Sequence, residues 1–151
     1  MNLLQTIHAR WAADTDLTIL LPATADNSPG GTNRVHTGMD FDPDLPFAVI
    51  ELQGSTPEQI DQCNRAIDRA WIRIQVFVAN HDHGEKIIRA IKAAFTRSTF
   101  DLLAGSSSSS GVDADRVTNM QRTNDSQFQE PDGTWRFVID FDCWVFLLNG
   151  Y

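Results

Sequence analysis

Residues 70–95, AWIRIQVFVANHDHGEKIIRAIKAAF, carry the two clearest periodic patterns of the chain. From residue 71 to residue 78, aliphatic residues alternate with other residue types, which is the two-residue period of a strand. From residue 85 to residue 95, apolar residues recur at the spacing that gathers one stripe on an α-helix, opposite a charged face. The stretch therefore predicts a strand followed by an amphipathic helix that buries its stripe on the neighbouring sheet. The aliphatic strand face is Ile72, Ile74, Val76 and Val78, and the helix stripe is Ile87, Ile88, Ile91, Ala94 and Phe95.

The turn between these two elements contains His81, Asp82 and His83, which could be imagined as a metal or proton-transfer cluster. Alternate residues in a turn diverge, and no third ligand is spaced with the two histidines. Asp82 followed three residues later by Glu85 is a capping signal. We therefore predict that Asp82 caps the helix and that the histidines form no site.

The C-terminal third predicts a hairpin. Residues 116–129 alternate weakly and read as an edge strand that is polar on both faces, and Pro131-Asp132-Gly133 supplies the turn. Residues 135–147 then form a long strand with one continuous apolar face. The other face begins with Arg136, Asp140 and Asp142 and ends with Trp144, Phe146 and Leu148. This terminal apolar patch requires a cover, either the N-terminal helix or another subunit.

The N-terminal half predicts shorter elements. We expect a helix over residues 2–13 with Asn2 as a possible cap, and a second short helix over residues 14–21. Short strands are expected over residues 34–37 and 47–52. Thr56, Pro57 and Gln59 occupy the cap, first-turn and capping-box positions of a helix start, so we expect a turn or two of helix over residues 57–64.

These elements predict an α+β fold. The sheet should be mostly antiparallel, with four to five strands packed by an N-terminal helix and a central amphipathic helix. At 151 residues the chain has the size of a single domain, residues 1–151. Two loops should be flexible, at about residues 22–33, which have turn chemistry throughout, and at about residues 104–114, which contain a run of five serines.

Composition narrows the class of protein. A net charge of -8 argues against nucleic-acid binding, which is driven by basic side chains that displace counterions from phosphate. No segment approaches the roughly 20 apolar residues of a membrane helix. Cys63 and Cys143 belong to no C-x-x-C pattern, so we expect neither a zinc site nor a disulfide, and cytoplasmic thiols are the plain interpretation.

The residues offer little chemistry. Asp40, Asp42 and Asp44 invite comparison with a calcium loop, but Leu45 stands where that loop needs glycine. There is no G-x-S-x-G sequence and no phosphate-binding glycine loop. We therefore expect no catalytic, cofactor or metal site, and a protein that is not an enzyme. The four tryptophans are better read as core or subunit contacts than as a ligand platform.

The order of these elements resembles the tail-completion, or tail-terminator, proteins of long-tailed bacteriophages and prophages. The segments that carry the resemblance are LLQTIHARWAAD, RVHTG, LPFAVIEL, WIRIQVFVAN, GEKIIRAIKAAF and WRFVIDFDCWVFLL. It implies a homo-oligomer, commonly a hexameric ring, that caps the tail tube and docks with the head-side connector. It also implies assembly in the host bacterial cytoplasm and a final place in the virion tail. Residues 56–66 and the serine run 106–110 depart from the pattern expected of this family.

Function in such a protein would lie in its assembly surfaces. Our candidates are Asp40, Asp42 and Asp44, the serines Ser106, Ser108 and Ser110, and the apolar Trp144, Phe146 and Leu148. One alternative is a head-closure or neck protein of the same assembly. Another is a small ligand-binding or enzymatic α+β domain with a cleft beside the helix of residues 85–95, near Trp71 or His81.

Overall fold

The fold is built on one mixed sheet. The computed structural model describes residues 3–23, 33–38, 44–60, 66–96, 100–101 and 116–147. The elements are α1 (Leu3–Ala13), α2 (Thr15–Leu20), β1 (Val35–His36), β2 (Phe47–Ile60), β3 (Ala66–Val78), α3 (His81–Phe95), β4 (Phe100–Asp101), β5 (Arg116–Gln129) and β6 (Trp135–Leu147). The strand order is β1-β2-β3-β6-β5-β4, and every pair is antiparallel except β1 with β2. The predicted α+β class is confirmed, with four long strands and two strands of two residues each.

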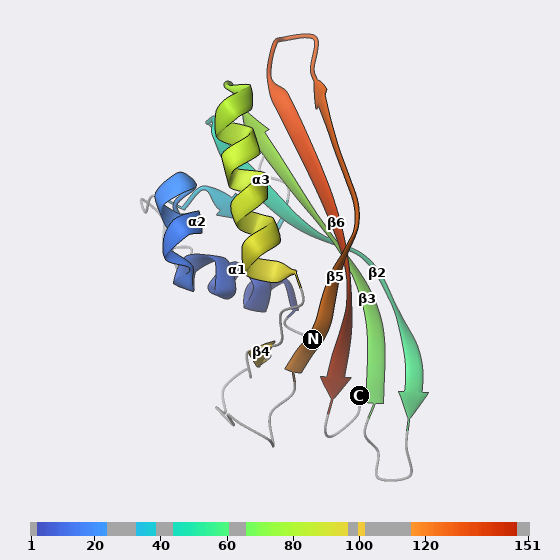
Figure 1. Ribbon diagram of the computed structural model, residues 1–151. Helices are drawn as coiled ribbons and strands as arrows, with labels where there is room; N and C mark the ends of the chain where they lie inside the picture. Colours follow the sequence, from blue (N-terminus) through green and yellow to red (C-terminus); the bar gives the residue numbers. More distant parts are fainter. Residues whose placement is uncertain are drawn as a thin grey trace.

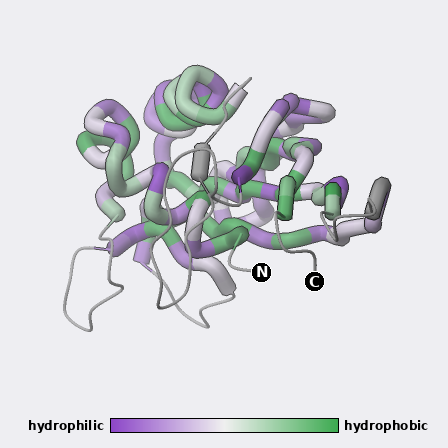
Figure 2. Tube along the Cα trace, turned by 90° about the horizontal axis from the view of Figure 1, so that it is seen from below, coloured by the Kyte–Doolittle hydropathy of each residue, from purple (hydrophilic) through white to green (hydrophobic). Residues whose placement is uncertain are grey.

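The three helices lie on one side of the sheet (Figure 1), and the view from below shows the same two layers (Figure 2). The aliphatic face predicted for the central strand is fully buried, as are Ile87, Ile91 and Phe95 of α3. Ile7 and Trp11 of α1 belong to the same core. Both periodic patterns of residues 70–95 are therefore confirmed, since the strand and helix bury the predicted faces against each other. None of the described helices is long and apolar enough to cross a membrane.

Helix α3 approaches the sheet closely at Gly84. A Cβ atom at this position would overlap the ring of Phe137 in β6. Gly84 therefore sets the distance between the first turn of α3 and the sheet, because any larger residue would push the two apart.

The N-terminal helices also agree with the sequence. Asp14 caps α2, and its side chain accepts a hydrogen bond from the backbone N–H of Leu17 at 3.0 Å. The indole N–H of Trp11 donates to the carbonyl oxygen of Leu21 at 3.0 Å, which ties the end of α2 to α1. The proposed cap at Asn2 lies outside the described residues.

The prediction that Asp82 caps the central helix is wrong. Helix α3 begins at His81, and the cap is Asn80, whose side-chain oxygen accepts from the backbone N–H of Asp82 at 2.9 Å. Asn80 has the extended backbone of a cap residue, with φ -115° and ψ 124°. Asp82 lies instead in the first turn, where its negative charge interacts favourably with the positive end of the helix dipole.

The helix predicted over residues 57–64 is also wrong as far as the structure describes it, through residue 60. Strand β2 continues to Ile60, with Thr56 opposite Arg69 and Pro57 opposite Asp68. β1 covers β2 only at Ala48 and Val49, so the later part of β2 is an edge along the described chain. Proline is tolerated on an edge strand, where its missing N–H breaks no ladder hydrogen bond. The capping signal is thus overridden by pairing with β3.

The C-terminal hairpin forms as predicted. Glu130 donates its backbone N–H to the carbonyl of Thr134 at 2.8 Å, and Gly133 adopts φ +92°, a conformation that suits glycine. β4 pairs with β5 only at Arg116 and Val117, so most of β5 is an edge strand among the described residues. Residues 121–129 of β5 are exposed, in agreement with a strand that is polar on both faces.

Candidate assembly surface

The helices cover one face of the sheet, and none of the described helices lies over the other face (Figure 1). We call this second surface the open face. Its side chains alternate with those of the core along the two central strands, which pair in register over their whole length. From β3 it comprises Ile67, Arg69, Trp71, Arg73, Gln75 and Phe77, and from β6 Arg136, Val138, Asp140, Asp142, Trp144 and Phe146.

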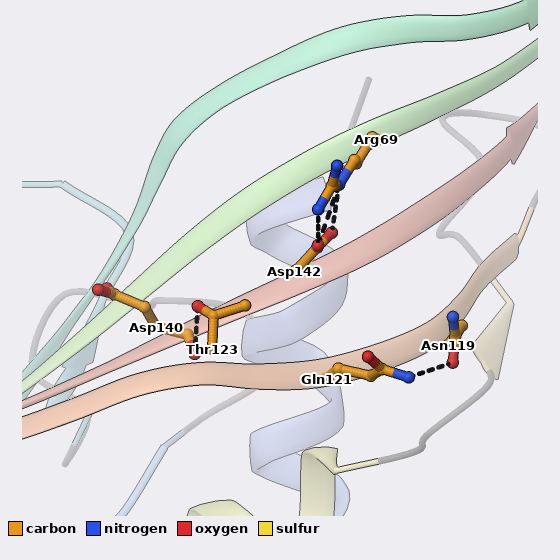
Figure 3. A network of polar contacts seen from close by, with 6 residues as sticks. All are labelled: Arg69, Asn119, Gln121, Thr123, Asp140 and Asp142. Atoms are coloured by element: carbon orange, nitrogen blue, oxygen red, sulfur yellow. Dashed lines mark hydrogen bonds and ion pairs between the residues drawn. The ribbon is translucent and has the colours of Figure 1, made fainter.

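Two arginine–aspartate bridges occupy the middle of the open face. The guanidinium of Arg69 donates to both oxygens of Asp142, with distances of 2.5 to 3.1 Å (Figure 3). Arg73 donates from Nε and Nη2 to Asp140 at 2.8 and 3.2 Å. Hydrogen bonding to these carboxylates raises the pKa of both arginines. The charges at the centre of the face are therefore matched within the chain.

One end of the open face is aromatic. The ring of Phe47 stacks on that of Phe77 at a centroid distance of 4.6 Å. The guanidinium of Arg136 lies 5.6 Å from the ring centroid of Phe77 and 5.0 Å from that of Phe128, and it donates to the side-chain oxygen of Gln75 at 2.8 Å. A shallow depression of about 540 Å³ opens beside this cluster. It is lined by Leu45, Phe47, Phe77, Glu130, Pro131, Asp132 and Thr134.

The opposite end carries the apolar candidates identified in the sequence. Trp144 and Phe146 are half-buried and lie opposite Thr118 and Arg116 of β5. Helix α1, one of the two covers considered for them, packs on the other face through Trp11. The cover by the N-terminal helix is therefore excluded, and the assembly role of this patch remains a prediction. Leu148 lies outside the described residues.

The loop candidates are described only at Asp44. This residue is exposed, and its backbone carbonyl accepts a hydrogen bond from Arg34 at 3.1 Å. Asp40, Asp42, Ser106, Ser108 and Ser110 lie outside the described residues, as do the serine run and most of residues 22–33.

The residues of the proposed ligand cleft do not converge. Trp71 lies on the open face, on the other side of the sheet from α3. The Nε2–H of His81 donates to the side-chain oxygen of Gln127 at 3.0 Å, whereas that of His83 donates to the carbonyl of Leu20 at 3.0 Å. The two histidines thus fix α3 to different elements. Within the described ranges no group of three or more His, Cys, Asp or Glu side chains is placed to hold a metal ion.

A groove of about 460 Å³ does lie beside α3, between this helix and β5. It is lined by Glu85, Ile88, Arg89, Lys92, Asp125, Ser126, Gln127, Phe137 and Val138. Lys92 Nζ forms an ion pair with the carboxylate of Asp125 at 2.5 Å, and Arg122 binds the same carboxylate at 2.8 Å. The hydrogen bond from Lys92 is the main cause that lowers the pKa of Asp125. The Lys92–Asp125 bridge joins α3 to β5 at the groove, whereas Arg122 and Asp125 both lie on β5.

The bridges of the open face were not predicted from the sequence. The strand pattern placed Arg136, Asp140 and Asp142 at the polar start of one face of residues 135–147, but it did not pair the aspartates with Arg69 and Arg73. The signal was present, because Arg69 and Arg73 on one strand match two aspartates on the strand that pairs with it. Finding the pairs required the register between β3 and β6.

Comparison with known proteins gives a family and a fold. The family described as Tail completion protein gp17 has a model that matches residues 5–145. Among solved structures, a chain from "Virion of native gene transfer agent (GTA) particle" matches with a TM-score of 0.64 and 14% identity, over 96% of this chain and 95% of that chain. At this identity the structural likeness shows a shared fold. No curated protein matches the chain.

Proposed function

The chain belongs to the Tail completion protein gp17 family, and from this premise we propose that it is a structural subunit that caps the tail tube of a phage or prophage and joins it to the head connector. It would act as a tail terminator without catalysis or a cofactor. The subunit would assemble in the bacterial cytoplasm and remain in the virion tail. The likeness to a chain of a gene transfer agent virion supports a place in such a particle.

The observation that carries this proposal is the open face. A sheet with helices on one side presents its other side as a broad surface, and here both ends of that surface are aromatic. Aromatic residues and arginine are enriched where proteins bind one another. The open face is therefore suited to contact another virion subunit, either the tail tube or a second copy of this chain.

A ring imposes a further requirement on the subunit. Each copy in a head-to-tail ring presents two different patches, one to each neighbour. We propose that Trp144, Phe146 and Leu148 belong to one contact surface of the assembled tail. The loops with Asp40, Asp42 and Asp44, and with Ser106, Ser108 and Ser110, are proposed as the others, and the ring is proposed to be a hexamer.

Electron microscopy of particles made without this protein tests the role. Loss of a terminator leaves tube growth without its stop, so we expect overlong tubes that return to normal length when the protein is supplied. Tails of normal length that fail to join heads would instead indicate a head-closure or neck role. Normal, infectious particles made without the protein would refute both roles.

A further inference from the structure

We propose that neighbouring copies of this chain contact each other through their helix layers. Helix α2 of one copy fits the groove between α3 and β5 of the next copy through Ile19, near the C-terminal end of α2. This inference rests on the proposed function, because it assigns the lateral contact of a self-assembling subunit. It concerns a different surface from the open face.

Helix α2 presents an apolar side chain next to a negative charge. Ile19 is 74% exposed, the most exposed of the large hydrophobic residues described. Asp16 lies three residues earlier, on the same side of the helix, and forms no ion pair with any described residue. A single exposed isoleucine is ordinary on a protein surface. Its significance comes from a matching site elsewhere on the chain.

The groove offers that site. Its apolar floor is formed by Ile88 of α3 and Phe137 of β6, and its walls are α3 and β5. Both floor side chains are less than a tenth exposed, so the floor is an apolar surface held firmly by the core. An aliphatic side chain from outside would bury its own surface against these residues, which is favourable.

The charges around the groove complement those of α2. Of its two acidic residues, Asp125 is bound by Lys92 and Arg122, and Glu85 is outnumbered by Lys86 and Arg89 on the same helix. Arg89 lines the groove without an ion pair to any described residue, and the exposed Lys86 lies one turn before it. The groove side therefore presents unmatched positive charge toward the unmatched Asp16. Such complementarity favours one orientation of the two surfaces.

The two surfaces lie where a head-to-tail contact needs them. α2 packs on one side of α3, and β5 lies on the other side (Figure 1). When α2 of one copy binds the groove of the next, the first copy still has an unoccupied groove and the second copy still has an unoccupied α2. The contact is heterologous and can be repeated until a ring closes.

The described sheet edges are poorly suited to the same task. Strand β2 carries Pro57 and two register shifts, and β5 carries two register shifts of its own. Proline and bulges are devices that prevent strands from pairing edge to edge. Copies of this chain would therefore join more readily through the helix layer than by extending the sheet.

Site-directed cross-linking tests the contact. Ile19→Cys and Glu85→Cys are made separately in a Cys63→Ser background, mixed at high concentration or on tail tubes, and treated with a short bismaleimide. We expect a covalent dimer that contains one chain of each variant. Ser55→Cys, at an exposed position of β2 that β3 and β6 separate from β5, replaces Glu85→Cys as the control and should not cross-link to Ile19→Cys.

Charge reversal gives an independent test. Asp16→Lys or Arg89→Glu alone should weaken self-association by about tenfold, and the two together should restore most of it. Asp132→Lys, on the hairpin turn, is the matched control and should change nothing. Circular dichroism establishes that each variant folds.

The outcomes separate this inference from the proposed function. If assembly of the wild-type chain proceeds but the mixed dimer and the rescue are both absent, the contact is refuted and the tail role stands. If the wild-type chain associates with neither itself nor tail tubes, and its loss leaves tails normal, the tail role fails and the contact fails with it.

Discussion

Asp125 is held by two basic side chains at the mouth of the groove beside α3. The hydrogen bond from Lys92, together with the second cation Arg122, keeps the pKa of Asp125 below its ordinary value. A carboxylate whose folded pKa is depressed stabilises the fold above its unfolded pKa, about 3.9, and loses that effect as pH falls through the lower folded pKa. The contribution is modest because both side chains of the pair are about a third exposed.

We therefore predict that Asp125→Asn lowers the free energy of unfolding at pH 7 and that its difference from wild type shrinks below about pH 3.9. Urea denaturation at a series of pH values measures this difference. Asp16→Asn removes a carboxylate that forms no ion pair with described residues, and it serves as the control. A difference that stays constant from neutral to strongly acidic pH would contradict the ion pair.

Cys143 is buried in the sheet, and desolvation raises the pKa of its thiol to about 12. Because the thiolate is the reactive form, alkylation of the folded chain at pH 8 should be roughly a thousandfold slower than that of an ordinary cysteine. The Cys63→Ser variant leaves Cys143 as the remaining cysteine, and iodoacetamide labelling followed by mass spectrometry measures the rate. The same chain unfolded in urea should react at the ordinary rate. Rapid labelling without denaturant would mean that β6 is not packed as described.

At the level of elements, Gly84 decides how closely α3 lies on β6. Alanine would favour the helix by about 1 kcal/mol, but its Cβ overlaps the ring of Phe137 and over-packing costs about 1–3 kcal/mol. We predict that Gly84→Ala is a net destabilisation of about 1 kcal/mol, as measured by urea denaturation. Adding Phe137→Leu should make the alanine better tolerated than it is in the wild-type background. Equal costs of the alanine in both backgrounds would show that the helix does not meet the sheet there.

The start of α3 gives a second prediction at this scale. Asn80→Ala removes the cap and should lower stability by about 1 kcal/mol, whereas Asn80→Asp should be tolerated. Asp82→Ala loses only the interaction of its charge with the helix dipole, about 0.3–1 kcal/mol. Urea midpoints of the three variants rank these effects. If Asp82→Ala proved the most costly, Asp82 would be the cap after all.

Periodicity predicted the elements, whereas local signals failed where pairing or geometry intervened. The alternation around Ile72 and Ile74 and the stripe through Ile91 could be read without a structure, because each buried face has its own period. The capping signal at Pro57 was overridden by the register with β3, which the sequence does not display. Asn80 and not Asp82 is the cap because Asn80 is the last residue with extended backbone before the helix begins at His81. The sequence alone does not show where the backbone becomes helical.

The candidate surface was predictable to a similar degree. The apolar end at Trp144 and Phe146 followed from alternation along one strand. The bridges of Arg69 and Arg73 need two strands in register, and the groove needs the position of α3 relative to β5. Patterns within one element were therefore sufficient for single strands and helices. Surfaces shared between elements needed the packed structure.

At the level of the whole molecule, the covered and the open faces of the sheet should separate stability from assembly. We predict that Trp144→Ser with Phe146→Ser leaves a folded chain that no longer restores normal tail length. These side chains are half-buried on the face away from the core, so the loss of stability should be smaller than for a core residue. Complementation followed by electron microscopy measures tail length, and circular dichroism measures folding.

Leu52→Ser is the matched control for this prediction. Leu52 is 40% exposed and lies opposite Ile72, on the helix side of the sheet. The Leu52→Ser variant removes an exposed apolar side chain without changing the open face, and it should restore normal tail length. Normal tails with the Trp144 and Phe146 double variant would remove this patch from the assembly surface.

The arginine–aspartate bridges at the centre of the open face have a consequence for ionic strength. The charges of Arg69 and Arg73 are already neutralised by Asp142 and Asp140, so a partner that covers them needs no acidic side chains of its own. Binding through this face should therefore depend little on salt, whereas the contact between α2 and the groove joins unmatched charges and should weaken as salt screens them. A tail whose terminator binds through the open face would therefore keep that terminator at high salt concentration as well as in dilute buffer.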